Sequence, residues 1–196
     1  MILTGDEIAR EVNCGRIHIS PFSADQVEPN SYGFRLGSDF MYYDALIVDA
    51  LQERPPEVRF AITESGHVLE PGRFYLGRTL ETMGSDHYAA TLYARRSVST
   101  MGMWIQFSAP LGHTGAIIPW TLEITVAHQI IVYPGMLIGK IAFWRPMGPR
   151  LLYAGKYSGS STVVPSRMYD EVQGGASGDL DRPRDHREPH ERQDSH

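Results

Sequence analysis

Short runs of apolar and β-branched residues, separated by turn-forming residues, recur along most of the chain. They occupy positions 33–40, 58–62, 74–81, 89–94, 104–107, 121–127, 129–132 and 137–144. Turn formers such as Pro71-Gly72 and Pro134-Gly135 stand between several of them. Strands at this spacing predict an all-β barrel or double-sheet sandwich, because alternating βαβ units would need long helical patterns between the strands.

Helical patterns are few. Thr4 precedes two acidic residues and the apolar Ile8, and Gly15 follows, which predicts a short capped helix at the N-terminus. Two weaker patterns predict helices at 45–51 and at 97–101.

Composition divides the chain into a domain and a tail. Residues 172–196 are polar and rich in charge, with almost no apolar side chain to bury, so we expect a disordered C-terminal tail. The preceding residues 1–171 are enough for one domain with a hydrophobic core.

Charge and cysteine content exclude several classes of function. A net charge of −5 argues against affinity for a nucleic acid polymer. The chain has neither an apolar run long enough to span a membrane nor a signal-peptide pattern at its start, which predicts a cytoplasmic protein without membrane partners. One cysteine cannot supply the paired cysteines of a zinc deaminase, so zinc-activated water of that type is not expected.

Arg95, Arg96 and Ser97 follow a strand-like segment and form a candidate anion site. Guanidinium groups and a hydroxyl are suitable donors for a phosphate. An ordinary solvated arginine pair fits the local sequence equally well.

Glu123 is the candidate general base. Alternation along its predicted strand places it on the polar side with Thr121 and Thr125. If this side faces solvent, Glu123 is unremarkable. If it lines a pocket, the partly desolvated carboxylate is suited to proton transfer.

The segment 156–167 is polar and contains a lone lysine and an aromatic ring, Lys156 and Tyr157. It fits either a lid over a nucleotide or a plain exit loop.

Six motifs, in order from residue 1 to about residue 169, resemble the dCTP deaminase branch of the trimeric dUTPase superfamily. They are the opening MILTGDEIAREVNCGRIHISPF, EPNSYGFRLG at 28–37, VLEPGRFYLGRTLE at 68–81, ARRSVSTMGM at 94–103, YPGMLIGKIAF at 133–143, and the stretch from Lys156-Tyr157 to Pro165-Ser166-Arg167. The fold implied by this resemblance is a distorted double-layer β-barrel, assembled as a homotrimer with active sites between subunits.

The resemblance also implies a function and a site. It implies binding of a pyrimidine nucleotide with Mg²⁺ on the phosphates, no protein ligands to a metal and no zinc. Glu123 would activate water for attack on C4 of cytosine, and Ser97 would share a catalytic role with its phosphate contact. The implied phosphate ligands are Arg95, Arg96, Ser97 and Lys156, and the implied base or sugar contacts are Ser108, Ala109, Tyr153, Tyr157 and Ser160.

Several positions depart from the family pattern. Arg96 replaces a serine, Thr100 an arginine, Ser160 a glutamine and Gly33 an aspartate, and the stretch 108–115 lacks the aspartate on which dUTPase-type hydrolysis relies. Three functions therefore remain open: a cytosine nucleotide deaminase, a triphosphate pyrophosphatase, and a nucleotide-binding protein without turnover. Retention of Glu123 favours the deaminase, with His113 or His128 as the alternative proton carrier.

Overall fold

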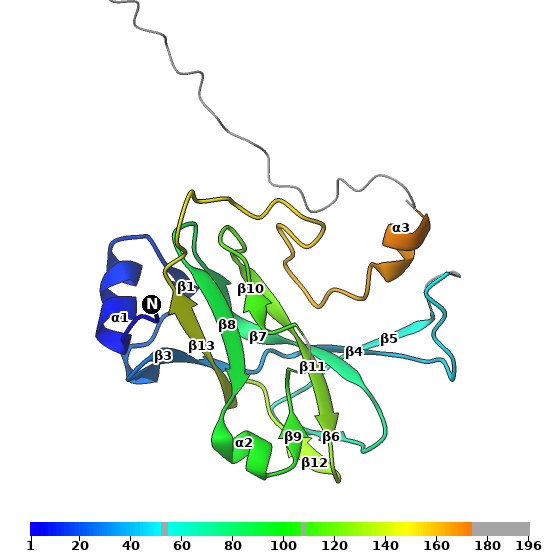
Figure 1. Cartoon of the computed structure of the whole chain (residues 1–196). Helices are drawn as coiled ribbons and strands as arrows, with labels where there is room; N and C mark the ends of the chain where they lie inside the picture. The colour runs from blue at the N-terminus through cyan, green and yellow to red at the C-terminus, as the bar shows by residue number, and fades with distance from the viewer. Residues whose placement is uncertain (52–54, 107–108, 174–196) are drawn as a thin grey trace, which may run out of the picture.

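The computed structural model describes residues 1–51, 55–106 and 109–173. In this part of the chain the protein is mainly β, with two large sheets, a two-stranded ladder and short helices (Figure 1). The predicted mainly β class and the N-terminal helix are confirmed.

The first sheet has six strands centred on the long strand β7. Its members are β1 (His18–Ser20), β4 (Asp39–Tyr43), β5 (Glu57–Ala61), β7 (Tyr75–Gly84), β9 (Met103–Trp104) and β11 (Ile118–Val126). The order is β5-β4-β7-β11-β9, and β1 also pairs with β7. All of these pairings are antiparallel, an arrangement that allows one face to be buried and the other to be polar.

The second sheet has five strands in the order β10-β8-β13-β3-β2. These are β2 (Val27–Glu28), β3 (Ser31–Arg35), β8 (Ala89–Ala94), β10 (Leu111–Gly112) and β13 (Leu137–Trp144). Two further strands, β6 (His67–Leu69) and β12 (Ile130–Val132), pair with each other.

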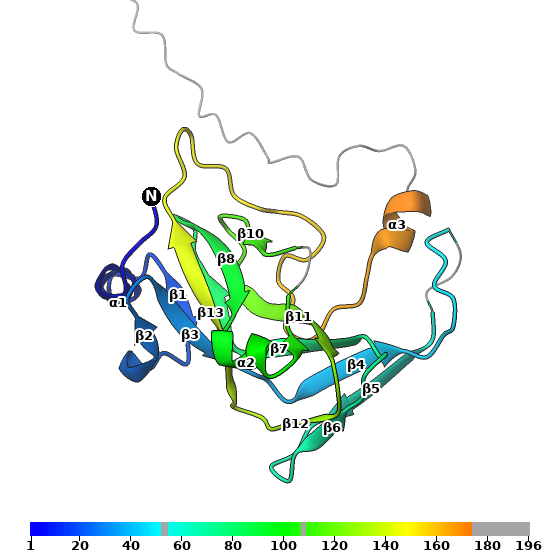
Figure 2. The ribbon, with the colours of Figure 1, turned by 60° about the horizontal axis from the view of Figure 1, so that its bottom comes forward.

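The two large sheets pack face to face around one core. Phe34 from β3 and Phe143 from β13 share a buried cluster with Tyr75 from β7 and Ile124 from β11, and all four are at most 2% exposed. The double layer is thus confirmed, and the two views show the sheets as opposed layers (Figure 2). The strand pairings of the described residues do not close into a barrel.

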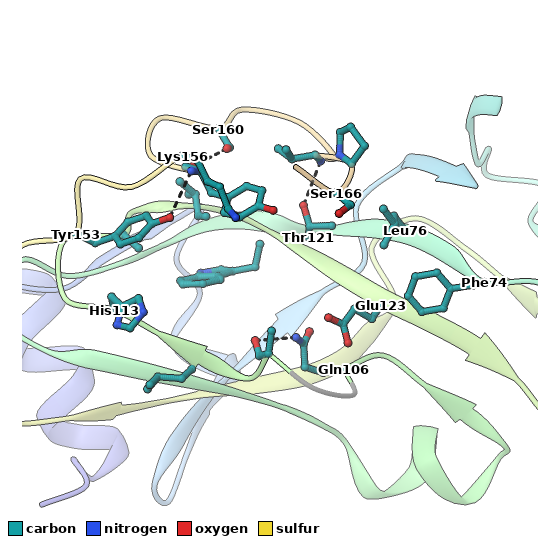
Figure 3. Close-up of a pocket in the computed structure, with 18 of the residues that line it drawn as sticks. Phe74, Leu76, Gln106, His113, Thr121, Glu123, Tyr153, Lys156, Ser160 and Ser166 are labelled. Carbon is teal, nitrogen blue, oxygen red and sulfur yellow. Dashed lines mark hydrogen bonds between the residues drawn. The ribbon is translucent and has the colours of Figure 1, made fainter. Parts of the chain in front are cut away.

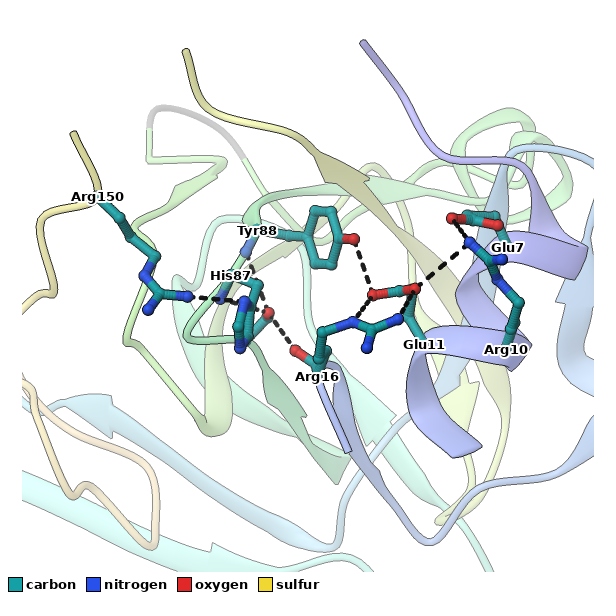
Figure 4. Close-up of polar contacts among 8 residues, drawn as sticks. Glu7, Arg10, Glu11, Arg16, His87, Tyr88 and Arg150 are labelled. Carbon is teal, nitrogen blue, oxygen red and sulfur yellow. Dashed lines mark hydrogen bonds and ion pairs between the residues drawn. The ribbon is translucent and has the colours of Figure 1, made fainter. Parts of the chain in front are cut away.

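The helices of the described residues are short. They are α1 (Gly5–Asn13), η1 (Ala24–Gln26), α2 (Arg96–Thr100) and α3 (Met168–Gln173), and α1, η1 and α2 contact strands of the sheets. Thr4 caps α1 as predicted, since its hydroxyl accepts the Glu7 N–H at 3.4 Å. Buried Glu11 ties α1 to the sheets by accepting hydrogen bonds from Arg16 and from the Tyr88 hydroxyl (Figure 4).

The prediction of a helix at 45–51 is wrong. No helix forms there, and Leu46 and Ile47 are exposed. A short segment whose apolar side chains are largely exposed lacks most of the tertiary packing on which helices depend.

The single strand predicted at 33–40 is two strands, β3 and β4, which belong to different sheets. The crossing occurs at Leu36 and Gly37, whose N–H groups donate to Met136 O and Arg78 O, both at 2.8 Å. A Cβ at Gly37 would lie 3.0 Å from the Arg78 side chain, so the close approach favours glycine.

The predicted boundary between domain and tail, at residue 171, falls inside α3. Residues 174–196 of the predicted tail lie outside the described residues. In the described part, none of the helices combines the length and apolarity needed to cross a membrane.

Candidate functional site

A cavity of about 540 Å³ lies between β11 and the C-terminal segment 151–167 (Figure 3). Other walls come from residues 109–116 and from Phe74 and Leu76 at the start of β7. The cavity has the size of a small-molecule site and is lined mainly by apolar side chains with a few polar groups among them.

Glu123 lines this cavity. Of the two positions considered from the sequence, on a solvent-facing surface or on a pocket wall, the structure has the second. Along β11, Leu122 and Ile124 are fully buried in the core, while Thr121, Glu123 and Thr125 are half-buried on the other side. The predicted alternation is therefore confirmed, and it directs the carboxylate away from the core. Its backbone is fixed on both sides, because Glu123 is opposite Leu76 of β7 and donates its N–H to Ile105 O at 3.1 Å.

An irregularity in β11 adds an indole to the cavity wall. The register with β7 shifts between Pro119 and Thr121, and both Trp120 and Thr121 line the cavity. A bulge of this kind lets consecutive residues face the same side of a sheet. Trp120 is held in place by its backbone N–H, which donates to Thr79 Oγ1 at 2.9 Å, and by Nε1–H, which donates to Met83 O at 3.0 Å.

Gly112 makes room for that indole. A Cβ at this position would lie 2.3 Å from Cη2 of Trp120. The indole donor is already satisfied inside the protein, so Trp120 contributes apolar surface to the cavity and no further polar hydrogen.

The C-terminal segment covers the cavity. The Val164 N–H donates to Thr121 Oγ1 at 3.2 Å, and the Ser166 N–H donates to Tyr43 Oη at 2.7 Å. Val163 is 2% exposed and packs in a small cluster with Met41 and Leu76. The segment 156–167 therefore lies over the cavity, and its interpretation as a lid over a nucleotide stays a prediction.

Three residues predicted from this segment, Lys156, Tyr157 and Ser160, line the cavity. The Lys156 ammonium forms an ion pair with Glu171 of α3 and lies 5.2 Å from the centre of the Tyr157 ring. The Ser160 hydroxyl donates to Tyr157 O at 2.6 Å. The segment thus brings a cation and an aromatic ring to the same wall.

Tyr153 and Ala109, two of the implied base or sugar contacts, also line the cavity. Tyr153 stacks on His113, with ring centroids 5.5 Å apart, and donates its N–H to Thr114 O at 2.8 Å. His113, one of the two alternative proton carriers, lies on the cavity wall, whereas His128 does not.

The structure does not bring the predicted phosphate cluster to this cavity. Arg95 is the N-cap of α2, and Arg96 and Ser97 are its first two residues. None of the three is among the cavity-lining residues. Arg95 instead lies 3.5 Å from a carboxylate oxygen of Glu28. Ser108, predicted to contact the base, lies outside the described residues.

Gln106 and Trp120 are cavity residues that the sequence reasoning missed. Gln106 stands beside Glu123 in Figure 3, and its Nε2 donates to Ala109 O at 2.9 Å. The irregular β11 register that brings Trp120 to the cavity has no signature in the sequence. Gln106 lies inside the run predicted as a strand at 104–107, where nothing in the local sequence marks it as a site residue.

No group of three or more His, Cys, Asp or Glu side chains arranged to hold a metal ion occurs within residues 1–51, 55–106 and 109–173. The polar groups of the cavity are thus a carboxylate, an ammonium, an imidazole, an amide and hydroxyls. Such a set is suited to binding a polar ring and moving protons next to it.

Comparison with known families gives a match to the model described as dCTP deaminase-like, over residues 2–146. The chain belongs to the dCTP deaminase-like family. Two relatives, each named dCTP deaminase, dUMP-forming, come from Hathewaya histolytica and Leptospira biflexa. Both are 36% identical and align with 88% of this chain, and the match covers 100% and 99% of their own lengths.

A solved structure, the 2′-deoxycytidine 5′-triphosphate deaminase from Agrobacterium tumefaciens, shares the fold with a TM-score of 0.57 and 22% identity. The match covers 74% of this chain and 48% of that one, so it spans about half of the solved chain. The family model and the two relatives agree with the family resemblance drawn from the six sequence motifs, and the solved structure agrees with the fold.

Proposed function

We propose that this dCTP deaminase-like protein is a hydrolase that removes the 4-amino group of a cytosine deoxynucleotide, with dCTP as the substrate. The observation that carries the proposal is the position of Glu123, whose carboxylate lines a covered cavity beside an amide, an ammonium and aromatic rings. The relatives named as dCTP deaminases supply the substrate class.

In the proposed reaction, the Glu123 carboxylate takes a proton from a water molecule as the water oxygen bonds to C4 of the cytosine ring. The proton then passes to the amino nitrogen, the bond between C4 and this exocyclic nitrogen breaks, and ammonia leaves. The remaining hydroxyl proton ends on ring N3 as the carbonyl forms at C4, which balances the reaction as cytosine plus water giving uracil plus ammonia. A positioned carboxylate that accepts and returns one proton is the usual general acid–base arrangement. Each step uses a group that the described cavity contains.

The names of the relatives add a second product. Formation of dUMP from dCTP requires loss of the amino group and of diphosphate, so the relatives' name supports a proposal in which diphosphate release accompanies deamination. Diphosphate release by this chain is measured together with ammonia release.

Phosphate binding completes the proposal. Lys156 is the cavity cation for the phosphates, and the Arg95–Ser97 cluster does not line the cavity of its own chain. We therefore propose that a neighbouring copy supplies Arg95, Arg96 and Ser97, as in the homotrimer implied by the family. Sedimentation showing a stable monomer near 22 kDa at micromolar concentration would contradict this part.

The described residues contain no group of three or more His, Cys, Asp or Glu side chains that could hold a metal ion, and Mg²⁺ enters the proposal as an ion held by the nucleotide phosphates. No step above depends on it. A cytoplasmic location follows from the proposed substrate and stays a prediction.

The decisive experiment compares the wild-type protein with Glu123→Gln, which keeps the side-chain shape. With dCTP and Mg²⁺, the wild type should release ammonia, while the variant should lose about 10²- to 10⁴-fold in rate and bind the nucleotide within a few-fold. Diphosphate is assayed in the same reaction. Wild-type rates in the Gln variant would exclude Glu123 as the base, and His113 would then be tested.

A further inference from the structure

The carboxamide oxygen of Gln106 is the only buried side-chain polar atom without a hydrogen-bond partner in the described part of the chain. Buried polar atoms in native proteins are nearly always paired, so an exception in a candidate active site needs an explanation. Gln106 lies on the cavity wall, which places the unpaired oxygen at the edge of the site.

The orientation of this amide is fixed. Its Nε2–H donates to Ala109 O at 2.9 Å, and a half-turn of the amide would bring Oε1 against the same carbonyl oxygen. Two acceptors facing each other repel, so the side chain keeps its acceptor, not its donor, available for another group.

Gln106 is also fixed next to the proposed base. Glu123 donates its backbone N–H to the carbonyl of Ile105, the residue immediately before Gln106. Both side chains line the same cavity, and Figure 3 shows the two polar ends side by side.

We propose that Gln106 is a specificity residue whose Oε1 accepts a hydrogen bond from the 4-amino group of the cytosine ring. This inference rests on the proposed function. It assigns to Gln106 the recognition of the group that leaves, and it gives the unpaired oxygen a partner when substrate is bound. The contact also holds C4 beside the Glu123 carboxylate.

The same contact distinguishes substrate from product. Deamination replaces the amino donor at C4 by a carbonyl acceptor, and the Ala109 contact prevents the Gln106 amide from turning its donor to meet it. A uracil nucleotide therefore faces an acceptor where a cytosine nucleotide faces a partner. A site with a buried hydrogen-bonding group rejects a ligand that leaves this group unpaired.

The test measures binding without turnover. Isothermal titration calorimetry gives the Kd of dCTP and of dUTP for the Glu123→Ala protein and for the Glu123→Ala, Gln106→Met double variant. The preference for dCTP over dUTP should fall by about tenfold or more in the double variant, because Met has no acceptor. Gln106→Leu is the second variant, and each protein is first shown to have a cooperative melting transition.

Gln129→Met is the matched control, because Gln129 bonds to the Glu70 carboxylate outside the cavity and its replacement should leave the preference unchanged. If the Gln106 variants bind dCTP and dUTP more weakly by the same factor, Gln106 only holds Ala109 in place, and the inference is overturned. An absent preference for dCTP in the Glu123→Ala protein would overturn it as well. Failure of the deaminase proposal would appear separately, as absent ammonia release by the wild type.

Discussion

Replacing Glu11 by Gln should destabilise the folded protein in a pH-dependent manner. The Glu11 carboxylate is 1% exposed, and it accepts two hydrogen bonds from Arg16, at 2.5 and 2.6 Å, and one from the Tyr88 hydroxyl, at 2.8 Å (Figure 4). Chiefly because of the Arg16 hydrogen bonds, the pKa of Glu11 is lowered from 4.5 to about 2. Burial raises the pKa of Tyr88, so this hydroxyl stays protonated and donates.

The lowered pKa of Glu11 determines how much its carboxylate stabilises the fold and how this stabilisation changes with pH. A fall of this size corresponds to roughly 3 kcal/mol in favour of the folded, ionised state, and solvent screening at Arg16, which is 43% exposed, reduces it to about 1 to 2 kcal/mol. The contribution is fully present above pH 4.5, where the unfolded carboxyl is ionised, and is lost as the pH falls toward 2.

Thermal unfolding followed by circular dichroism between pH 7 and pH 3 measures this contribution. At pH 7, Glu11→Gln should lower the Tm by about 3 to 6 °C, and the difference from wild type should shrink by roughly half or more by pH 3. Glu7→Gln is the control, since Glu7 pairs with the exposed Arg10 on the same helix and such pairs contribute little. A Glu11→Gln difference that stays constant with pH, or that equals the control, would refute the reasoning.

Two further substitutions test the walls of the cavity. Gly112→Ala should cost about 1 to 3 kcal/mol of stability, because the new Cβ overlaps the Trp120 ring. In a double-mutant cycle, adding Trp120→Phe should recover part of this loss. Fully additive changes in stability would mean that the Trp120 ring does not cause the loss. Glu171→Gln should strengthen dCTP binding by about twofold to fivefold in a fluorescence titration, because it frees the Lys156 ammonium from its carboxylate partner. Weaker binding would instead mean that the ion pair supports the site.

The alternation of apolar and polar residues along the sequence predicted the elements that have one face in the core and the other outside it. The alternation at 121–127 identified β11 and the side on which Glu123 lies, because its core-facing and cavity-facing residues differ in polarity. The capping pattern at Thr4 likewise identified α1. The strand pair β3 and β4 was read as one strand, since Leu36 and Gly37 continue an apolar run through the point where the chain changes sheets.

The order of the sequence motifs predicted some residues of the candidate site. The residues that reach the cavity only through the three-dimensional geometry were not predicted. Glu123 is distant in sequence from the adjacent pair Lys156 and Tyr157, and the family resemblance alone brought the three together. Trp120 reaches the cavity through a register shift, and the unpaired oxygen of Gln106 exists only because Ala109 O holds the other end of the amide. Neither feature depends on local residue type alone.

The segment over the cavity is anchored apart from the main core. Val163 belongs to a small cluster with Met41 and Leu76, and the large cluster between the sheets includes none of these three. Regions held by few buried contacts open locally at a free energy below that of global unfolding. We therefore expect access to the cavity to be set by a local equilibrium, so that substitutions around Val163 change the rate of ligand exchange while the sheets and Glu123 stay in place.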